Sequence, residues 1–290
     1  MQKCTMSQQK SKPFLENKRI LVTGGAGSIG SELVRQLAPN NKVFIVDLNE
    51  TGAFDLREEL VREKYWVHSR TGDIRNKETL QDVFSDFKPE VVFHAAALKH
   101  VTPNEEYPRE AVETNILGTL NVIEHAKSYG VQKFVFISTD KAVQSSSIMG
   151  ATKRVSEIIT RNQGKGFVVV RFGNVLGSRG SVIPLWQKQI DEGKAITVTD
   201  EKMTRYMMTI EDAVRLVIKA AEQGCGGEIF CLDMGKKVNV LELAKEIVKG
   251  TKSEIKIIGV RPGEQMTERL MFEEEERVAK KFDNFYVIPS

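Results

Sequence analysis

The stretch Arg19-Ile-Leu-Val-Thr-Gly-Gly-Ala-Gly-Ser-Ile-Gly30 decides the fold. Its first five residues are apolar or β-branched enough for a buried strand, and the glycines then turn the chain into a helix predicted over 31–37. This glycine spacing lets the backbone approach a pyrophosphate at a helix N-terminus, where free N–H groups favour anions. Glycines alone are weak evidence, but between a strand and a helix they are strong. The predicted pyrophosphate contacts are Gly24, Gly27, Ser28, Ile29 and Gly30.

The next strand, Lys42-Val-Phe-Ile-Val46, ends at Asp47, at the distance where a dinucleotide site needs an acid. Its carboxylate can accept bonds from both adenosine ribose hydroxyls and would repel a 2′-phosphate. No Arg follows in Leu48-Asn-Glu50. The sequence therefore predicts NAD as the cofactor, with NADP as the alternative.

Strands alternate with helices over residues 14–173, and each strand is nearly all apolar. This pattern predicts an α/β fold with a Rossmann-type doubly wound parallel sheet, which is the NAD-binding domain. A glycine-rich loop follows, so we expect 174–209 and 235–290 to form a smaller C-terminal α/β substrate domain. The helix and strand over 210–234 are expected to cross back, with the strand at the edge of the large sheet.

Composition excludes several classes of protein. The 42 Lys and Arg nearly balance the 39 Asp and Glu, so charge gives no case for nucleic-acid binding. No apolar run approaches the roughly 20 residues that span a bilayer, and residues 1–10 lack the core of a signal peptide and are expected to be a disordered lead-in. The three cysteines lack the spacing of a metal site or a disulfide framework, which suits a reducing cytosol. We expect a soluble cytoplasmic protein without a metal site.

A second stretch, Ser138-Thr-Asp-Lys-Ala-Val-Gln-Ser-Ser-Ser-Ile-Met-Gly-Ala-Thr-Lys153, carries the candidate chemistry. It follows the apolar run 134–137 and so opens at the C-terminal end of a strand, where open α/β sheets bind ligands. Thr139, Asp140 and Lys141 place a hydroxyl, an acid and an amine in consecutive positions. Singly, the acid could be a turn residue and the amine a solvated charge. Together they favour catalysis.

Lys153 follows Met149 by about one helical turn, so both can face one site. The arrangement resembles the extended short-chain dehydrogenase/reductase family, which normally has a Tyr where Met149 stands. Thr-Asp-Lys paired with Met-Gly-Ala-Thr-Lys resembles the bacterial UDP-N-acetylglucosamine 4,6-dehydratases in particular. The resemblance extends from about Phe14 to the end of the chain. Some relatives carry a large membrane-embedded N-terminal region, and we expect this chain to be a short soluble form.

The resemblance implies a hydro-lyase that converts UDP-N-acetylglucosamine to a UDP-4-keto-6-deoxy sugar for bacterial surface glycans. The C4 hydride goes to a tightly held NAD and returns to C6, while Lys141 removes the C5 proton and Asp140 protonates the departing hydroxyl. Thr139 is expected to bond the C4 hydroxyl, and Lys153 completes the catalytic set. Related enzymes that invert C5 have a Tyr where this chain has Met149, which holds no transferable proton, so we expect C5 to keep its configuration. The base for the C4 hydroxyl stays open.

The resemblance also implies further contacts by position. Those with the cofactor are Asp73, Ile74, Ala95, Ala96, Ala97, Lys99, Asn115 and Lys153. Those with the substrate are Lys99, Asn174, Arg179, Ser181, Val182, Arg205, Arg261 and Glu264. An Asx turn is the alternative for Asp73, an ordinary buried amide for Asn115, and a surface salt bridge for each Arg.

Two other functions stay open. A UDP-sugar 4-epimerase shares the fold and retains NAD, but it needs no Asp–Lys pair and normally relies on the missing Tyr. A catalytically inactive NAD-binding regulator would explain Met149, yet a decayed site would be expected to lose Asp140, Lys141 or Lys153 as well. By family analogy we expect a homo-oligomer, with a two-fold dimer formed through helices that flank the sheet.

Overall fold

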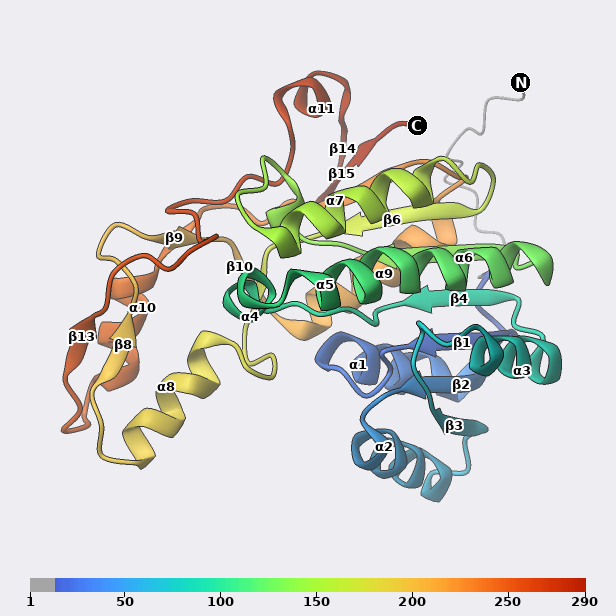
Figure 1. The fold of residues 1–290 in the computed structure, drawn as a ribbon, viewed down its shortest axis with the longest axis horizontal. Helices are drawn as coiled ribbons and strands as arrows, with labels where there is room; N and C mark the ends of the chain where they lie inside the picture. The colour runs from blue at the N-terminus through green and yellow to red at the C-terminus, as the bar shows by residue number, and fades with distance from the viewer. Residues whose placement is uncertain (1–13) are drawn as a thin grey trace.

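The computed structural model describes residues 14–290, so the expected lead-in at 1–10 lies outside the described residues. A large α/β unit carries the sheet, and a smaller unit of short strands and two helices lies beside it (Figure 1). Across the described part of the chain, none of the helices combines the length and the apolar character that a bilayer crossing requires.

The large unit is built on a nine-stranded sheet. Seven neighbouring strands are parallel, because each pairs with the next in parallel register. In spatial order they are β3 (Val67–Thr71), β2 (Lys42–Asp47), β1 (Arg19–Thr23), β4 (Val91–His94), β5 (Lys133–Ile137), β6 (Phe167–Arg171) and β11 (Ile229–Leu232). This is the strand order of dinucleotide-binding α/β folds. The predicted Rossmann-type sheet is confirmed.

The C-terminal end of the chain extends this sheet. An antiparallel hairpin, β14 (Lys280–Phe282) and β15 (Phe285–Ile288), pairs with β11. The prediction that β11 is the edge strand is therefore wrong, because β11 lies between β6 and β15. Phe285 provides the reason, since its ring stacks on that of Phe230 at 5.9 Å and buries both. Residues 280–288, expected in the smaller unit, lie in the large sheet.

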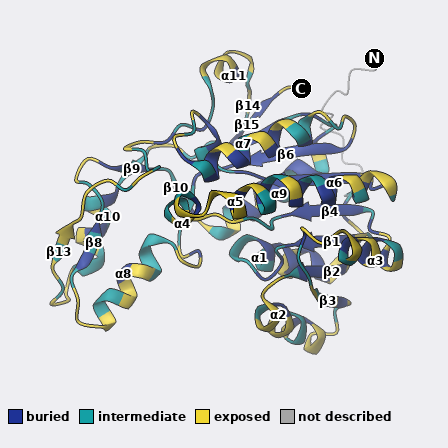
Figure 2. Ribbon diagram, in the orientation of Figure 1, coloured by how far each residue is buried: buried dark blue, intermediate teal, exposed yellow. Residues whose placement is uncertain are grey.

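Helices cover both faces of the sheet. One face packs on α1 (Ser28–Leu37), α2 (Glu50–Arg62) and α9 (Ile210–Gln223), and the other on α3 (Lys77–Phe87), α6 (Thr119–Ser128) and α7 (Ile148–Arg161). The strands form the buried layer between them (Figure 2). This explains why the parallel strands read as continuous apolar runs.

The helical stretch over residues 108–128 is interrupted by a π-helical turn. It follows the short α4 (Val101–Glu106) and consists of α5 (Pro108–Ala111), a π-helical turn at Val112–Gly118, and α6. At Gly118 an added Cβ would lie 2.7 Å from the Ile74 side chain, so this turn packs closely on the loop after β3. Single π turns inside helices are frequent at functional sites.

The smaller unit has its own core around the fully buried Trp186. It contains α8 (Val182–Asp191), β8 (Ile196–Val198) paired with β13 (Ile255–Ile257), and α10 (Val240–Val248). Two short ladders connect it to the large unit, β7 (Asn174–Val175) with β10 (Met207–Met208), and β9 (Thr204–Arg205) with β12 (Val238–Asn239). The remaining short elements are the 3₁₀ turns Ala38–Asn40 and Asp140–Ala142, and α11 (Glu273–Val278).

Candidate active site

The glycine-rich loop lies between β1 and α1, as predicted. Gly24 has φ +69°, and an added Cβ would lie 2.5 Å from the backbone nitrogen of Ala96. Only glycine therefore allows this loop to approach the segment after β4. Gly27 is the N-cap of α1 and supplies no side-chain cap, so the first turn keeps N–H groups for an anion. These features fit a dinucleotide pyrophosphate.

Asp47 ends β2 beside this loop. One carboxylate oxygen accepts from the Ala26 backbone N–H at 2.8 Å and the other from Asn49 N–H at 2.8 Å. The carboxylate thus fixes the turn and still has lone pairs for ribose hydroxyls. Its part in choosing NAD stays a prediction.

Asp73 forms the Asx turn that was the alternative interpretation. Its carboxylate accepts from the Arg75 backbone N–H at 2.8 Å and from the Arg75 guanidinium, and a contact with adenine stays a prediction. Ile74 beside it is buried.

Asn115 braces the loop after β4. Its side-chain oxygen accepts from Leu98 N–H at 2.8 Å, and its Nδ2 donates to the Leu98 carbonyl at 3.0 Å and to Thr152 Oγ1 at 3.0 Å. The π turn brings this amide to the loop, and so holds the backbone that continues from Ala95, Ala96 and Ala97. Asn115 is therefore a buried amide that braces this backbone, and its contact with the cofactor stays a prediction.

Thr139, Asp140 and Lys141 lie together at the carboxyl end of β5. Asp140 has no exposed surface, and its Oδ1 accepts from Thr139 Oγ1 at 3.0 Å and from Lys141 Nζ at 3.0 Å. Its Oδ2 is buried without a hydrogen-bond partner among residues 14–290. Gly173 explains this packing, since an added Cβ there would lie 3.0 Å from Oδ2. The sequence prediction of an acid–amine pair therefore has the required contact.

Lys141 also bridges the two units. Its Nζ donates to Asn174 Oδ1 at 2.8 Å, and Asn174 begins the loop to the smaller unit. The Lys141 side chain is 20% exposed, so the amine is reachable from solvent while the acid beside it is not. Asn174, predicted to bind substrate, is placed at the amine.

Met149 and Lys153 lie on the first turns of α7, and both are buried. Ser147 caps this helix, accepting from Gly150 N–H at 3.1 Å. An added Cβ at Gly150 would collide with the Lys141 carbonyl, so glycine lets the helix lie directly against the acid–amine turn. Lys153 Nζ donates to the Ile137 carbonyl at 2.6 Å, and burial lowers its pKa to about 7 although Glu157 opposes the shift.

Lys99 and Arg179 meet over the N-terminus of α1. Lys99 Nζ donates to the Arg179 carbonyl at 2.6 Å, and Arg179 N–H donates to Ser28 Oγ at 3.0 Å. The loop that runs on to Ser181 and Val182, at the start of α8, therefore contacts the end of α1 that follows the glycines. Predicted cofactor and substrate residues are adjacent here.

The two predicted diphosphate arginines are placed differently. Arg205 is buried, and its Nη1 donates to the carbonyls of Thr204 at 2.8 Å and Met266 at 3.3 Å. Arg261 is half-buried in a turn in which its N–H meets Glu264 at 3.4 Å. The roles of Arg205, Arg261 and Glu264 toward a substrate stay predictions.

Sequence reasoning missed one acidic residue of this site. Glu268 is 3% exposed, and its Oε1 lies 3.7 Å from Lys141 Nζ. It comes from an irregular segment near the C-terminus, where no helix or strand periodicity marks a buried face. Glu268 lies six residues after Pro262 in a mostly polar run, and nothing in this run indicates a buried or catalytic acid.

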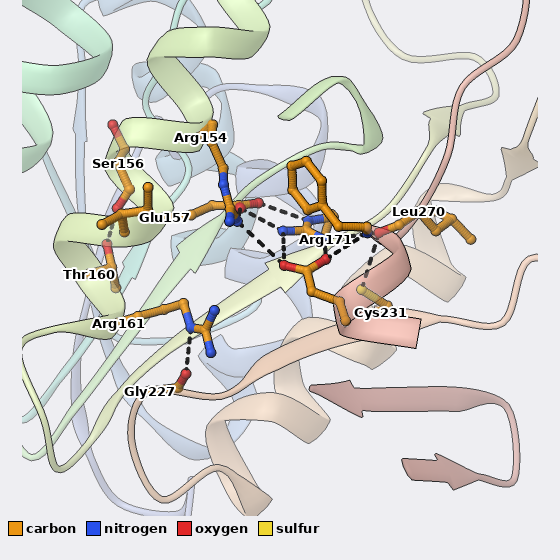
Figure 3. A network of polar contacts seen from close by, with 12 residues as sticks. Arg154, Ser156, Glu157, Thr160, Arg161, Arg171, Gly227, Cys231 and Leu270 are labelled. Carbon is orange, nitrogen blue, oxygen red and sulfur yellow. Dashed lines mark hydrogen bonds and ion pairs between the residues drawn. The ribbon is translucent and has the colours of Figure 1, made fainter. Parts of the chain in front are cut away.

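Sequence reasoning also missed a buried ion network around Arg171 (Figure 3). Arg171 at the end of β6 is fully buried and donates to Glu157 of α7 and Glu275 of α11, each at a closest distance of 2.6 Å. Its Nη1 also donates to the Leu270 carbonyl at 3.0 Å. Of the four glutamates of α11, Glu275 is therefore the buried one, because Arg171 pairs with it.

Comparison with known proteins places the chain. A family profile described as "Polysaccharide biosynthesis protein" matches residues 20–290. The chain belongs to this polysaccharide biosynthesis protein family. The predicted kinship with the extended short-chain dehydrogenase/reductases is confirmed. The chain is 46% identical to the capsular polysaccharide biosynthesis protein CapD of Staphylococcus aureus, over 94% of this chain and 48% of that protein. It thus spans about half the length of that relative.

Other relatives of the chain carry names of enzymes. The chain is 37% identical to a UDP-N-acetylglucosamine 4,6-dehydratase (inverting) of Campylobacter jejuni, over 95% of this chain and 84% of that enzyme. It is 38% identical to a UDP-glucose 4-epimerase of Rickettsia bellii, over 94% of this chain and 83% of that enzyme. Nucleotide-sugar dehydratases and epimerases are therefore both close relatives.

Solved structures agree with this family membership. Pen from Bacillus thuringiensis superposes with a TM-score of 0.90 at 38% identity, over 96% of this chain and 89% of that one. The UDP-glucose 4-epimerase of Thermus thermophilus, in complex with NAD, superposes with a TM-score of 0.78 at 27% identity. The superposition covers 87% of this chain and 90% of that one. NAD in a neighbour of this fold supports the predicted cofactor.

Proposed function

We propose that this chain is a UDP-N-acetylglucosamine 4,6-dehydratase that retains NAD. The observation that carries the proposal is the contact between the Asp140 carboxylate and the Lys141 amine at the carboxyl end of β5. Elimination of water needs a base and an acid held close together, whereas a 4-epimerase needs no such pair. The named dehydratase among the relatives supports the choice of substrate.

The glycine-rich loop, Asp47 and the bracing amide of Asn115 would hold the cofactor. When bound, NAD supplies reversible acceptance of the C4 hydrogen, which makes C4 a ketone and the C5 proton acidic. Lys141 then takes the C5 proton as a neutral amine. Asp140 gives its proton to the C6 hydroxyl, which leaves as water. Once C6 has received the hydrogen taken from C4, Lys141 returns its proton to C5, and the proton released by the C4 hydroxyl replaces the one that Asp140 gave up, so both groups are restored for the next cycle.

The remaining residues orient the sugar. Thr139 donates to Asp140 and can turn its hydroxyl to the C4 position. Asn174 accepts from the Lys141 amine at 2.8 Å and so fixes the position of the proposed base. Arg179 and Lys99 lie where a diphosphate would reach the N-terminus of α1.

Purified protein incubated with UDP-N-acetylglucosamine and NAD tests the proposal by mass spectrometry. We expect a product that has lost one water. Lys141→Met should reduce this product at least about 100-fold, because general-base catalysis contributes factors of this order. Lys165→Met, at an exposed lysine, is the matched control and should retain wild-type activity. Elimination at the wild-type rate in Lys141→Met would remove Lys141 from the base role.

A UDP-sugar 4-epimerase is the second candidate, because relatives of 38% identity carry that name. The same incubation distinguishes it, since an epimerase leaves the substrate mass unchanged while inverting C4. A non-catalytic NAD-binding regulator would give no reaction with any UDP-sugar.

A further inference from the structure

A second carboxyl group faces Lys141. Oε1 of Glu268 lies 3.7 Å from Lys141 Nζ and 3.9 Å from Arg205 Nε, both beyond hydrogen-bond distance. Its Oε2 is buried and has no hydrogen-bond partner among residues 14–290. A buried ionised carboxylate needs several donors, since losing water without replacement is costly. Glu268 lacks those donors within the described chain.

The backbone holds Glu268 in place from both sides. Two residues before it, the Met266 carbonyl accepts from Thr204 N–H at 3.0 Å and from Arg205 Nη1 at 3.3 Å. Two residues after it, the Leu270 carbonyl accepts from Arg171 Nη1 at 3.0 Å (Figure 3). Arg171 is itself fixed by two carboxylates, so this anchor is rigid. These backbone hydrogen bonds therefore hold the side chain of Glu268 beside the Lys141 amine.

We propose that Glu268 is a positioning residue of the acid–base site, which carries a proton in the working enzyme and so leaves Lys141 free to act as a neutral amine. This inference rests on the proposed dehydratase function and adds a residue to it. An ionised Glu268 would place a negative charge 3.7 Å from the amine and hold a proton on it. An ammonium group cannot accept the C5 proton.

The surroundings of Glu268 favour the protonated carboxyl. Burial raises the pKa of Glu268, and the neighbouring Asp140 adds to the rise, while Lys141 and Arg205 oppose it. These three charged groups lie near Glu268, Asp140 and Lys141 in the turn after β5 and Arg205 in β9. Tyr206, next to Arg205, faces Asp140 and carries no charge near neutral pH.

Glu268→Gln tests the proposal, because an amide has the shape of the neutral acid and cannot ionise. We expect this variant to dehydrate UDP-N-acetylglucosamine within about fivefold of wild type at pH 7. As pH rises, wild type should lose activity when Glu268 ionises, whereas the variant should keep it for at least about one further pH unit. Glu268→Ala, which removes the group, and Glu274→Gln, which changes an exposed carboxylate, are measured alongside. Glu268→Gln should move the alkaline limb and Glu274→Gln should not, while Glu268→Ala should be less active than Glu268→Gln.

A second readout does not depend on turnover. Because the folded-state pKa is raised, Glu268 stabilises the fold below its unfolded pKa and loses this contribution as pH rises through the folded pKa. The stability of wild type relative to Glu268→Gln should therefore fall with rising pH from about pH 5, with no such trend for Glu274→Gln. An inactive wild type would defeat the proposed function alone. A flat stability difference, an unshifted alkaline limb, or a Gln variant as inactive as the Ala variant would overturn the role of Glu268.

Discussion

At the scale of single residues, Lys153 shows how burial changes an amine. It is 6% exposed, its Nζ lies 4.2 Å from the centre of the Phe136 ring, and its one carbonyl acceptor belongs to Ile137. Desolvation lowers its pKa to about 7, against the opposing charge of Glu157. Met149 stands four residues before Lys153, so the protonation of this amine is set by burial and not by a neighbouring phenol.

This lowered pKa predicts a pH-dependent stability. Between the folded pKa of about 7 and the ordinary value of 10.5, the unfolded chain binds the proton that the folded chain has released, so stability rises with pH. Wild type relative to Lys153→Met should therefore gain about 2 kcal/mol in free energy of unfolding between pH 7 and pH 9. Urea denaturation at both values measures this. The exposed control Lys165→Met should show no change with pH, and a constant difference for Lys153→Met would contradict the assigned pKa.

At the scale of elements, one buried guanidinium joins three of them. Arg171 of β6 binds Glu157 of α7 and Glu275 of α11, and Arg154 adds a second cation at 3.0 Å from Glu157. Water cannot replace a lost partner of Arg171 or Glu157, since neither residue has exposed surface. A buried network of this kind is costly to break from one side.

Glu275→Gln tests this junction. It leaves Arg171 with one carboxylate in place of two, so we expect a loss of about 3 kcal/mol in free energy of unfolding. Glu274→Gln, on the exposed face of the same helix, should change it by less than about 0.5 kcal/mol. Equal effects of the two substitutions in chemical denaturation would show that the network contributes nothing specific to stability.

The sequence could predict the features of the site that depend on local signals, but not those that depend on distant contacts. The glycine-rich loop, Asp47 and the Thr139–Lys141 turn were predictable because their signals are local: a strand end, a turn and a helix start. Glu275 and Glu268 were not, because each is buried by a residue about a hundred positions away, Arg171 or Lys141. The π turn at 112–118 was also missed, since its residues continue the helical pattern on both sides.

At the scale of the whole molecule, the site joins both units at the carboxyl edge of the sheet (Figure 1). The acid–amine turn follows β5, Asn174 begins the passage to the smaller unit, and Glu268 belongs to the returning chain. The hairpin β14–β15 then ties this chain back to the large sheet. A substrate held at this edge would touch both units, as expected where the sheet order reverses.

The dimer through flanking helices stays a prediction. Leu117, Val155 and Ile158 are between 40% and 49% exposed on the π turn and α7, an apolar face of the kind that an isologous interface would cover.

The most direct measurement of the central claim is the product formed from UDP-N-acetylglucosamine in heavy water, followed by NMR from the first turnover. The account predicts a 4-keto-6-deoxy sugar with deuterium at C5 and C5 configuration retained, because Lys141 returns a proton to the face it came from and Met149 has none to give. Retention and inversion at C5 are both reasonable outcomes, because the Campylobacter jejuni relative is named as an inverting enzyme. A product inverted at C5 from the outset would contradict the role of Met149, and a C4 epimer that keeps its C6 hydroxyl would contradict the dehydratase itself.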